Sequence, residues 1–101
     1  MTTRRAKKAI REIAGPISFG DMLLSLRMSR ELSQVVFSEI LGVSKQDLCN
    51  IEKGRKIVSV ERAKNFAESL GMPPRVFAKY ALQDQLTLAG IEGEVEIKDV
   101  A

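Results

Sequence analysis

A short segment near the middle of the chain gathers polar side chains that can donate or accept hydrogen bonds. Its members are Ser44, Lys45, Gln46, Cys49 and Asn50. In a helix that starts after Ser44, these residues lie on the face left free by the apolar Leu48 and Ile51. Glutamine and asparagine can form paired hydrogen bonds with adenine, and lysine can donate to the acceptors of guanine. The pattern predicts a helix that enters the major groove of DNA N-terminus first, with these five side chains as the expected base contacts.

Two short capped helices on either side of a tight turn are expected to position these side chains. Ser33 can cap the first helix, which Gly42 ends in a left-handed conformation. Ser44 can cap the second helix, and Gly54 terminates it just before a basic cluster. This order is typical of a helix-turn-helix, although a plain helical bundle with polar exposed faces would give a similar pattern.

The remaining segments predict an all-α, five-helix domain that contains this helix-turn-helix. Besides the two motif helices, one helix is expected at about 19–30, one between the cap Ser59 and Gly71, and one from Pro73-Pro74 to about Ala89. Alternating residues in 94–98 predict a C-terminal β-strand, and apolar spacing in 4–13 predicts a short N-terminal helix. The expected domains are a basic N-terminal extension (1–16), the DNA-binding domain (17–90) and an acidic tail (91–101).

Composition narrows the possible functions. The 101 residues have room for one core, and no apolar stretch approaches the roughly 20 residues that cross a bilayer, so we expect a cytoplasmic protein without a membrane partner. The chain has one cysteine, Cys49, and no histidine, which removes an internal disulfide and a Cys/His zinc site. No nucleophile motif or phosphate loop appears. We therefore predict a non-enzyme with no metal and no cofactor.

Charge is distributed unevenly along the chain, although the net charge is only +3. Residues 1–15 carry five basic residues and one acidic residue, whereas residues 86–101 carry four acidic residues and one lysine. The basic segment could follow DNA phosphates, or it could simply be a solvated surface.

The central segment has a characteristic order of residue types, which runs Ser33-Gln34, Phe37-Ser38, Leu41-Gly42-Val43-Ser44, Leu48 and Ile51-Glu52-Lys53-Gly54-Arg55. Through these residues the chain resembles the Cro and phage-repressor (XRE) helix-turn-helix family over about residues 19–80. The resemblance implies a five-helix, lambda-repressor-like domain. It implies that Lys45, Gln46 and Asn50 face the bases. It also implies phosphate contacts from Gln34, Lys53, Arg55 and Lys56. Arg27 and Glu52 occupy the positions of a structural ion pair.

The sequence departs from the family pattern at three positions. Ser38 stands where the tight helix crossing usually has alanine, and serine is small enough to fit. Val58 stands where proline commonly precedes the next helix cap. Cys49 replaces a serine or other polar residue, which makes the base preference harder to infer, and without a second cysteine it suggests packing or a weak groove contact more than redox sensing.

These features predict a sequence-specific, dimeric transcriptional repressor of a near-palindromic operator. Small XRE proteins with short extensions also resemble HigA-like antitoxins, which bind their operator and a RelE/ParE-type toxin. A free-standing phage or metabolic regulator would have much the same sequence. The alternative from another class is a protein-interaction module without DNA binding, but such a module would be expected to lose Gln34 or the basic cluster.

The acidic tail is expected to act in pairing. Val95 and Ile97 would form one apolar face of its predicted strand, and the chain offers no second strand to cover the backbone edge. The strand could pair with its copy across a two-fold axis, which makes Val95 and Ile97 candidate dimerisation residues. It could alternatively join the sheet of a partner protein.

Overall fold

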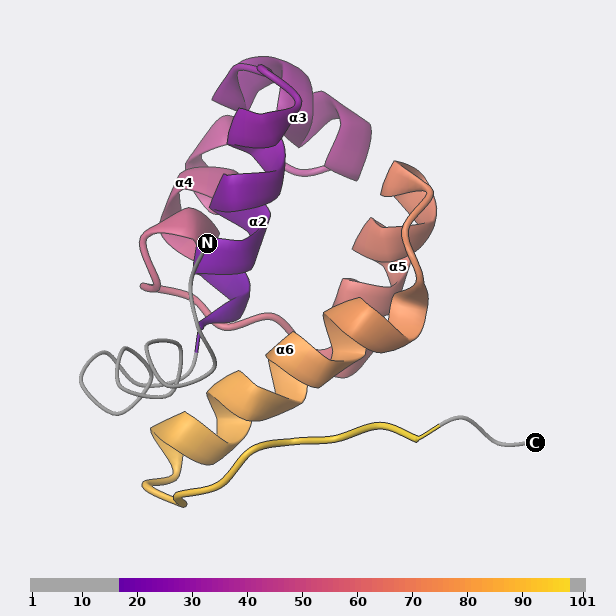
Figure 1. Ribbon diagram of the computed structural model, residues 1–101. Coiled ribbons are helices and arrows are strands. Elements are labelled where there is room, and N and C mark those ends of the chain that lie inside the picture. The colour runs from indigo at the N-terminus through magenta and orange to yellow at the C-terminus, as the bar shows by residue number, and fades with distance from the viewer. Residues whose placement is uncertain (1–16, 99–101) are drawn as a thin grey trace, which may run out of the picture.

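Five helices follow one another in the computed structural model, which describes residues 17–98 (Figure 1). They are α2 (Phe19–Ser29), α3 (Gln34–Leu41), α4 (Lys45–Glu52), α5 (Val60–Leu70) and α6 (Pro74–Leu88). The predicted all-α fold with five helices is confirmed, and each helix lies within a residue or two of the range expected for it. The short helix predicted at 4–13 falls outside the described residues.

Serine hydroxyls begin four of the five helices. Ser18, Ser33, Ser44 and Ser59 each accept a hydrogen bond from the backbone N–H three residues later, at 3.0–3.1 Å. Each bond satisfies one of the N–H groups that a first helical turn leaves without a partner. The fifth helix, α6, starts instead with Pro74 in its first turn, where a missing N–H costs nothing.

Aromatic side chains from three helices form the centre of the core. Phe19 packs edge-on against Phe77 with ring centroids 5.8 Å apart, and its centroid lies 6.3 Å from that of Phe66. Val58 is 1% exposed, so the position where the family often has proline here contributes an aliphatic side chain to this core. The core therefore joins α2, α5 and α6 behind the two motif helices.

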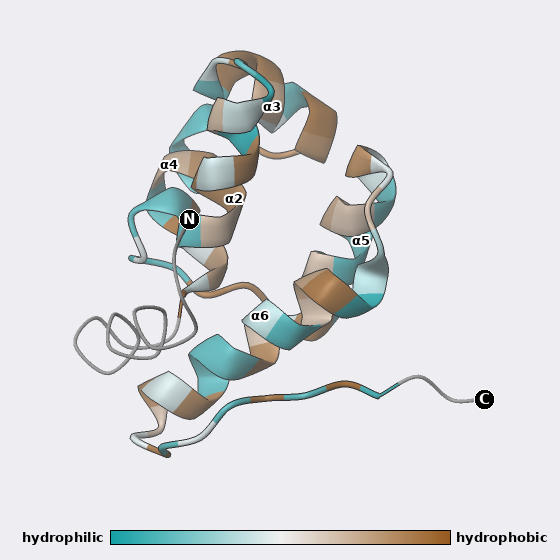
Figure 2. Ribbon diagram, viewed as in Figure 1, coloured by the Kyte–Doolittle hydropathy of each residue, from teal (hydrophilic) through white to brown (hydrophobic). Residues whose placement is uncertain are grey.

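The helix α3 is apolar on its outer side as well as on its buried side. Phe37 and Leu41 are buried, while Val35, Val36 and Ile40 are 39–49% exposed. Figure 2 shows this helix as largely brown. The helix thus lacks the one-sided apolar stripe of a typical surface helix. Tertiary packing on the Phe37 side therefore determines how α3 is oriented.

The C-terminal strand prediction is wrong for the described part of the tail. Residues 91–98 contain no strand, and Figure 1 shows them running back alongside α6. The buried Gln83 of α6 donates from Nε2 to the Gly93 carbonyl oxygen at 2.9 Å and accepts at Oε1 from the Val95 N–H at 2.9 Å. Val95 is half-buried and Ile97 is 39% exposed. One side-chain amide thus provides the bonds that a neighbouring strand would have provided.

None of the helices in residues 17–98 has the length and apolar character that crossing a membrane requires.

Candidate nucleic-acid interface

A glycine turn sets the angle between α3 and α4. Gly42 ends α3 with φ at +71°, a left-handed conformation that favours glycine, and the Val43 N–H donates back to the Ser38 carbonyl oxygen at 3.0 Å. Ser38 is 4% exposed, and its hydroxyl donates to the Val35 carbonyl oxygen at 2.7 Å. The serine that replaces the usual alanine therefore fits at the crossing without leaving a buried hydroxyl unsatisfied.

The predicted base-contacting residues lie together on one face of α4 and its cap, here called the recognition face (Ser44, Lys45, Gln46, Cys49 and Asn50). The first three are exposed, and Cys49 and Asn50 are half-buried. Leu48 and Ile51 are buried on the opposite side and fasten α4 to the core. The face is thus polar, accessible and carried by a packed helix, as entry into a major groove requires.

Two amides of the recognition face are joined in the free protein. Gln46 Nε2 donates to Asn50 Oδ1 at 3.2 Å, across one turn of α4. Each amide keeps a further donor or acceptor for a base edge. The bond restrains both side chains in the free protein, so less conformational entropy would be lost if they bound a ligand.

Glu52 connects α4 to α2 and α3 through two neighbouring side chains. Arg27 donates from Nε to Glu52 Oε2 at 2.8 Å and from Nη2 to Glu52 Oε1 at 3.0 Å. Gln34 Nε2 donates to the same Oε1 at 2.9 Å. The Glu52 side chain is 3% exposed and that of Arg27 is 16% exposed. The hydrogen bond to Glu52 raises the pKa of Arg27, against the opposing effect of burial.

This arrangement bears on the expected phosphate contact of Gln34. One N–H of its amide nitrogen faces Glu52, and a second N–H remains for another acceptor. Glu52 thus fixes the rotamer of Gln34 at the start of α3. A phosphate contact from Gln34 would use the second N–H.

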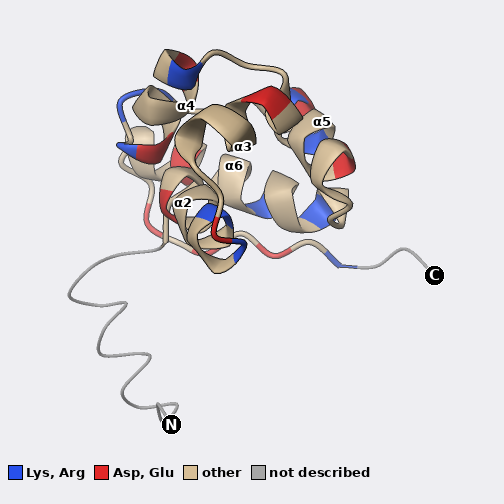
Figure 3. Cartoon of the chain, turned by 90° about the horizontal axis from the view of Figure 1, so that it is seen from above, with Lys and Arg blue, Asp and Glu red and all other residues tan. Residues whose placement is uncertain are grey.

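The basic cluster after α4 is exposed at all three positions, Lys53, Arg55 and Lys56. Within residues 17–98, neither Lys53 nor Arg55 forms an ion pair, whereas Lys56 Nζ lies 2.8 Å from Asp47 Oδ1. Figure 3 shows basic and acidic segments close together around α4. The surface is therefore mixed in charge. Within the described residues, Lys53 and Arg55 have no carboxylate partner, whereas Lys56 is paired.

Asp47 extends this network to α5. Arg62 Nη2 donates to Asp47 Oδ2, and the Arg62 guanidinium carbon lies 5.2 Å from the centroid of the Phe66 ring. The hydrogen bonds from Arg62 and then from Lys56 lower the pKa of Asp47. The stability that this carboxylate contributes is therefore present above its ordinary pKa and is lost as the pH falls through the lowered value.

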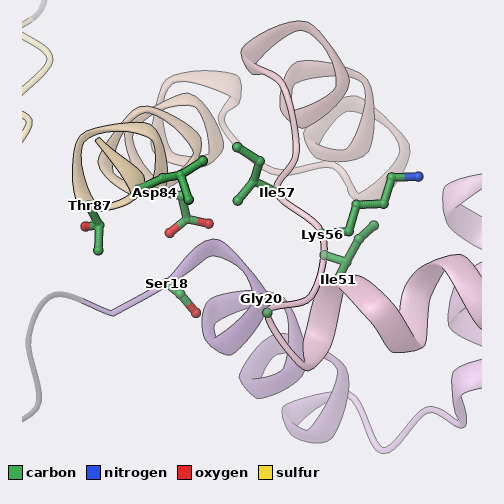
Figure 4. A pocket seen from close by; sticks show the side chains of 9 residues that line it. Ser18, Gly20, Ile51, Lys56, Ile57, Asp84 and Thr87 are labelled. Atoms are coloured by element: carbon green, nitrogen blue, oxygen red, sulfur yellow. The ribbon is translucent and has the colours of Figure 1, made fainter. Parts of the chain in front are cut away.

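The start of α2 lies directly against the end of α4. Gly20 is buried, and a methyl group there would overlap the carbonyl oxygen of Ile51. Beside this crossing, a pocket of about 180 Å³ opens between the start of α2, the segment after α4 and the end of α6 (Figure 4). Asp84 lines it and accepts from the Phe19 N–H at 3.2 Å. Burial raises the pKa of Asp84, and the bond from Phe19 partly opposes the shift.

The family model described as helix-turn-helix matches residues 23–77, which include both motif helices and the basic cluster. The chain belongs to the XRE-type helix-turn-helix family. A search of curated protein sequences gave no match. Among solved structures, the chain is similar to a proposed antidote protein of a plasmid maintenance system from Nostoc punctiforme PCC 73102. The two share 27% identity and a TM-score of 0.66, over 73% of this chain and 81% of that protein.

Three residues of this helix-turn-helix protein were not found by sequence reasoning. Asp47 and Arg62 lie 15 positions apart, so no helical spacing connects them. Gly20 gave no signal either, because a single glycine inside a helical pattern does not show what it packs against. Gly20 would have been detectable only as a residue with poor helix propensity near a helix start.

Proposed function

We propose that this protein is a sequence-specific transcriptional regulator that binds its operator as a dimer and represses from it. The recognition face supports this function most directly, because it gathers amide and ammonium groups on a helix that belongs to a helix-turn-helix. In this family such a helix is expected to present its N-terminal turns to base edges in the major groove. Lys45, Gln46 and Asn50 would provide sequence discrimination, with Ser44 and Cys49 beside them.

Phosphate contacts would come from residues at the border of the recognition face. Gln34 lies at the start of α3, and Lys53, Arg55 and Lys56 follow α4. Contacts with the backbone set the register of the protein on DNA but carry no sequence information. Substitutions in the base-contacting set should therefore weaken binding to the operator alone, whereas substitutions in the phosphate-contacting set should weaken binding to any DNA.

A dimer follows from the way such domains bind. One short helix of eight residues contacts only a few base pairs, and two-fold dimers read two half-sites about 34 Å apart. Selection of binding sites from random DNA duplexes tests this directly. Two related half-sites separated by about one helical turn would support the dimer, whereas a single isolated half-site would contradict it.

The narrower proposal is that the regulator is an antitoxin. The similarity to the proposed antidote protein supports it, and the partner would be a toxin of the RelE/ParE type encoded next to it. Co-expression with the product of the adjacent gene provides the test. Recovery of a complex that binds the selected operator would support an antitoxin, and growth unaffected by that product alone would contradict it.

Alanine at Lys45, Gln46 or Asn50 is expected to weaken operator binding by about 1–3 kcal/mol each, while binding to scrambled DNA persists. The reason is that a base contact is lost while phosphate contacts remain. Fluorescence anisotropy with selected and scrambled duplexes at one salt concentration measures both affinities.

The exposed Ser25 of α2 provides the control, because its replacement by alanine should leave both affinities unchanged. Full discrimination retained by all three alanine variants would place the bases against another surface.

Replacing Lys53 and Arg55 together by methionine is expected to weaken operator and scrambled DNA alike. Each phosphate contact contributes about 0.9 to the slope of log K against log salt, so the slope should become shallower by about two. Titrations between about 50 and 200 mM salt, as is usual for such slopes, measure the change.

Methionine at Lys64 and Lys79 removes the same charge from exposed positions on α5 and α6. Comparing the salt slopes of the two double variants distinguishes the loss of local phosphate contacts from the effect of a lower net charge. A loss of equal size in both double variants would show that the cluster makes no phosphate contact of its own.

A further inference from the structure

Asp47 stands out as an acidic side chain at the border of a surface that is expected to meet an anion. It lies in the first turn of α4, one position after Gln46 of the recognition face. At about 100° per residue, Asp47 lies at the edge of the recognition face, about 60° around α4 from Asn50. Its carboxylate turns toward Lys56 of the basic cluster and Arg62 of α5. Its side chain is 17% exposed, so it faces the protein more than the groove.

Both carboxylate oxygens of Asp47 are already engaged. Oδ1 accepts from Lys56 Nζ at 2.8 Å, and Oδ2 accepts from Arg62 Nη2. An aspartate that reads DNA accepts from the amino group of cytosine. Because each of its oxygens already pairs with a cation, Asp47 is poorly placed to accept from a cytosine. Its geometry is that of a residue that acts indirectly, by positioning Lys56 and Arg62.

The two cations differ in how firmly they are held. Arg62 is 30% exposed and stacks over Phe66, so it is fixed from two sides. Lys56 is 51% exposed, and its flexible side chain pairs with Asp47. The carboxylate thus neutralises much of the positive charge that Lys56 and Arg62 would present to phosphates.

We propose that Asp47 is a specificity-determining positioning residue that suppresses sequence-independent DNA binding by holding Lys56 and Arg62. Non-specific affinity comes almost entirely from phosphate contacts, whereas base contacts contribute only in the matched register. A carboxylate that engages two cations weakens the phosphate contacts and leaves the base contacts unchanged. In the operator complex, Lys56 would contact its phosphate from the position that Asp47 gives it.

This inference rests on the proposed DNA-binding function, and one experiment separates the two. Affinities of the wild-type protein and Asp47→Asn are measured for the selected operator and for scrambled duplex across a salt series. Near 0.15 M salt, Asp47→Asn is expected to bind scrambled DNA about fivefold more tightly for each additional phosphate that the released cations reach. The salt slope should become steeper by about one to two. Operator affinity should change less, so the ratio of operator to scrambled affinity falls.

Three further variants separate release of the cations from other effects. Glu68→Gln makes the same change in net charge and removes the ion-pair partner of Lys64 at 4.0 Å, and it should leave the affinity ratio unchanged. Asp47→Glu retains the carboxylate and should retain the wild-type ratio. Adding Lys56→Met to Asp47→Asn should reverse part of the increase in affinity for scrambled DNA. Circular dichroism at the assay temperature tests whether each variant is folded.

The outcomes are distinct. A wild-type protein that binds neither duplex contradicts the proposed function itself. If the wild type discriminates but Asp47→Asn shows an unchanged slope and ratio, the restraining role of Asp47 is overturned. Weaker binding of Asp47→Asn to both duplexes also overturns it, and would make Asp47 a support of the helix alone. If Asp47→Asn does not fold, an altered ratio in the folded Asp47→Glu variant overturns it.

Discussion

Replacing Arg27 by methionine is expected to lower the free energy of unfolding by about 3–5 kcal/mol. The change leaves the Glu52 carboxylate, whose side chain is 3% exposed, with the Gln34 amide as its remaining side-chain donor among the described residues. Water cannot solvate a carboxylate at that depth, and one neutral amide replaces little of what two guanidinium bonds supplied. Urea denaturation at neutral pH measures the loss.

Two comparisons test the cause of this loss. Glu68→Gln breaks the exposed pair with Lys64 and should cost less than about 1 kcal/mol. Combining Arg27→Met with Glu52→Leu removes both charges and should recover part of the stability. A single Arg27→Met variant as stable as Glu68→Gln would mean that the pair behaves as an exposed one.

Alanine at Gly20 is expected to destabilise the fold by about 3 kcal/mol, at the upper end of what overpacking costs. The added methyl group would overlap a backbone carbonyl oxygen of Ile51, and backbone cannot yield by changing a rotamer. The helix α2 would have to move away from α4. In a domain of this size the melting temperature should fall by about 12 °C or more.

The control for Gly20 lies on the same helix. Ser25→Ala, at an exposed position of α2, should alter stability by no more than about 0.5 kcal/mol. Because alanine favours helix over glycine by about 1 kcal/mol, helix propensity alone predicts a more stable Gly20→Ala variant. A rise in melting temperature would therefore exclude the close approach of the two helices.

The helices themselves were predictable from sequence because their ends are local. Ser33 and Ser44 each bind a backbone N–H three residues away, and Gly42 takes up its left-handed conformation within one turn. Such bonds need no partner from elsewhere in the chain. The same locality predicted that the recognition face lies opposite Leu48 and Ile51.

The tail shows where a local pattern was insufficient. Alternation in 94–98 indicated a strand, but a strand needs a neighbour, and alternation contains no information about which group provides it. In the structure the neighbour is the side chain of Gln83, which bonds Gly93 and Val95. The side-chain amide of one buried glutamine therefore took the place of a second strand.

By itself, the sequence determined the helical order, the helix-turn-helix and the residues that face outward from its second helix. These depend on caps, turns and periodicity, which act over a few residues. Only the tertiary structure decided that Gly20 lies against Ile51 and that Asp47 holds Lys56 and Arg62. Those contacts join residues 9 to 31 positions apart, and no local spacing specifies them, because they depend on how the packed helices cross.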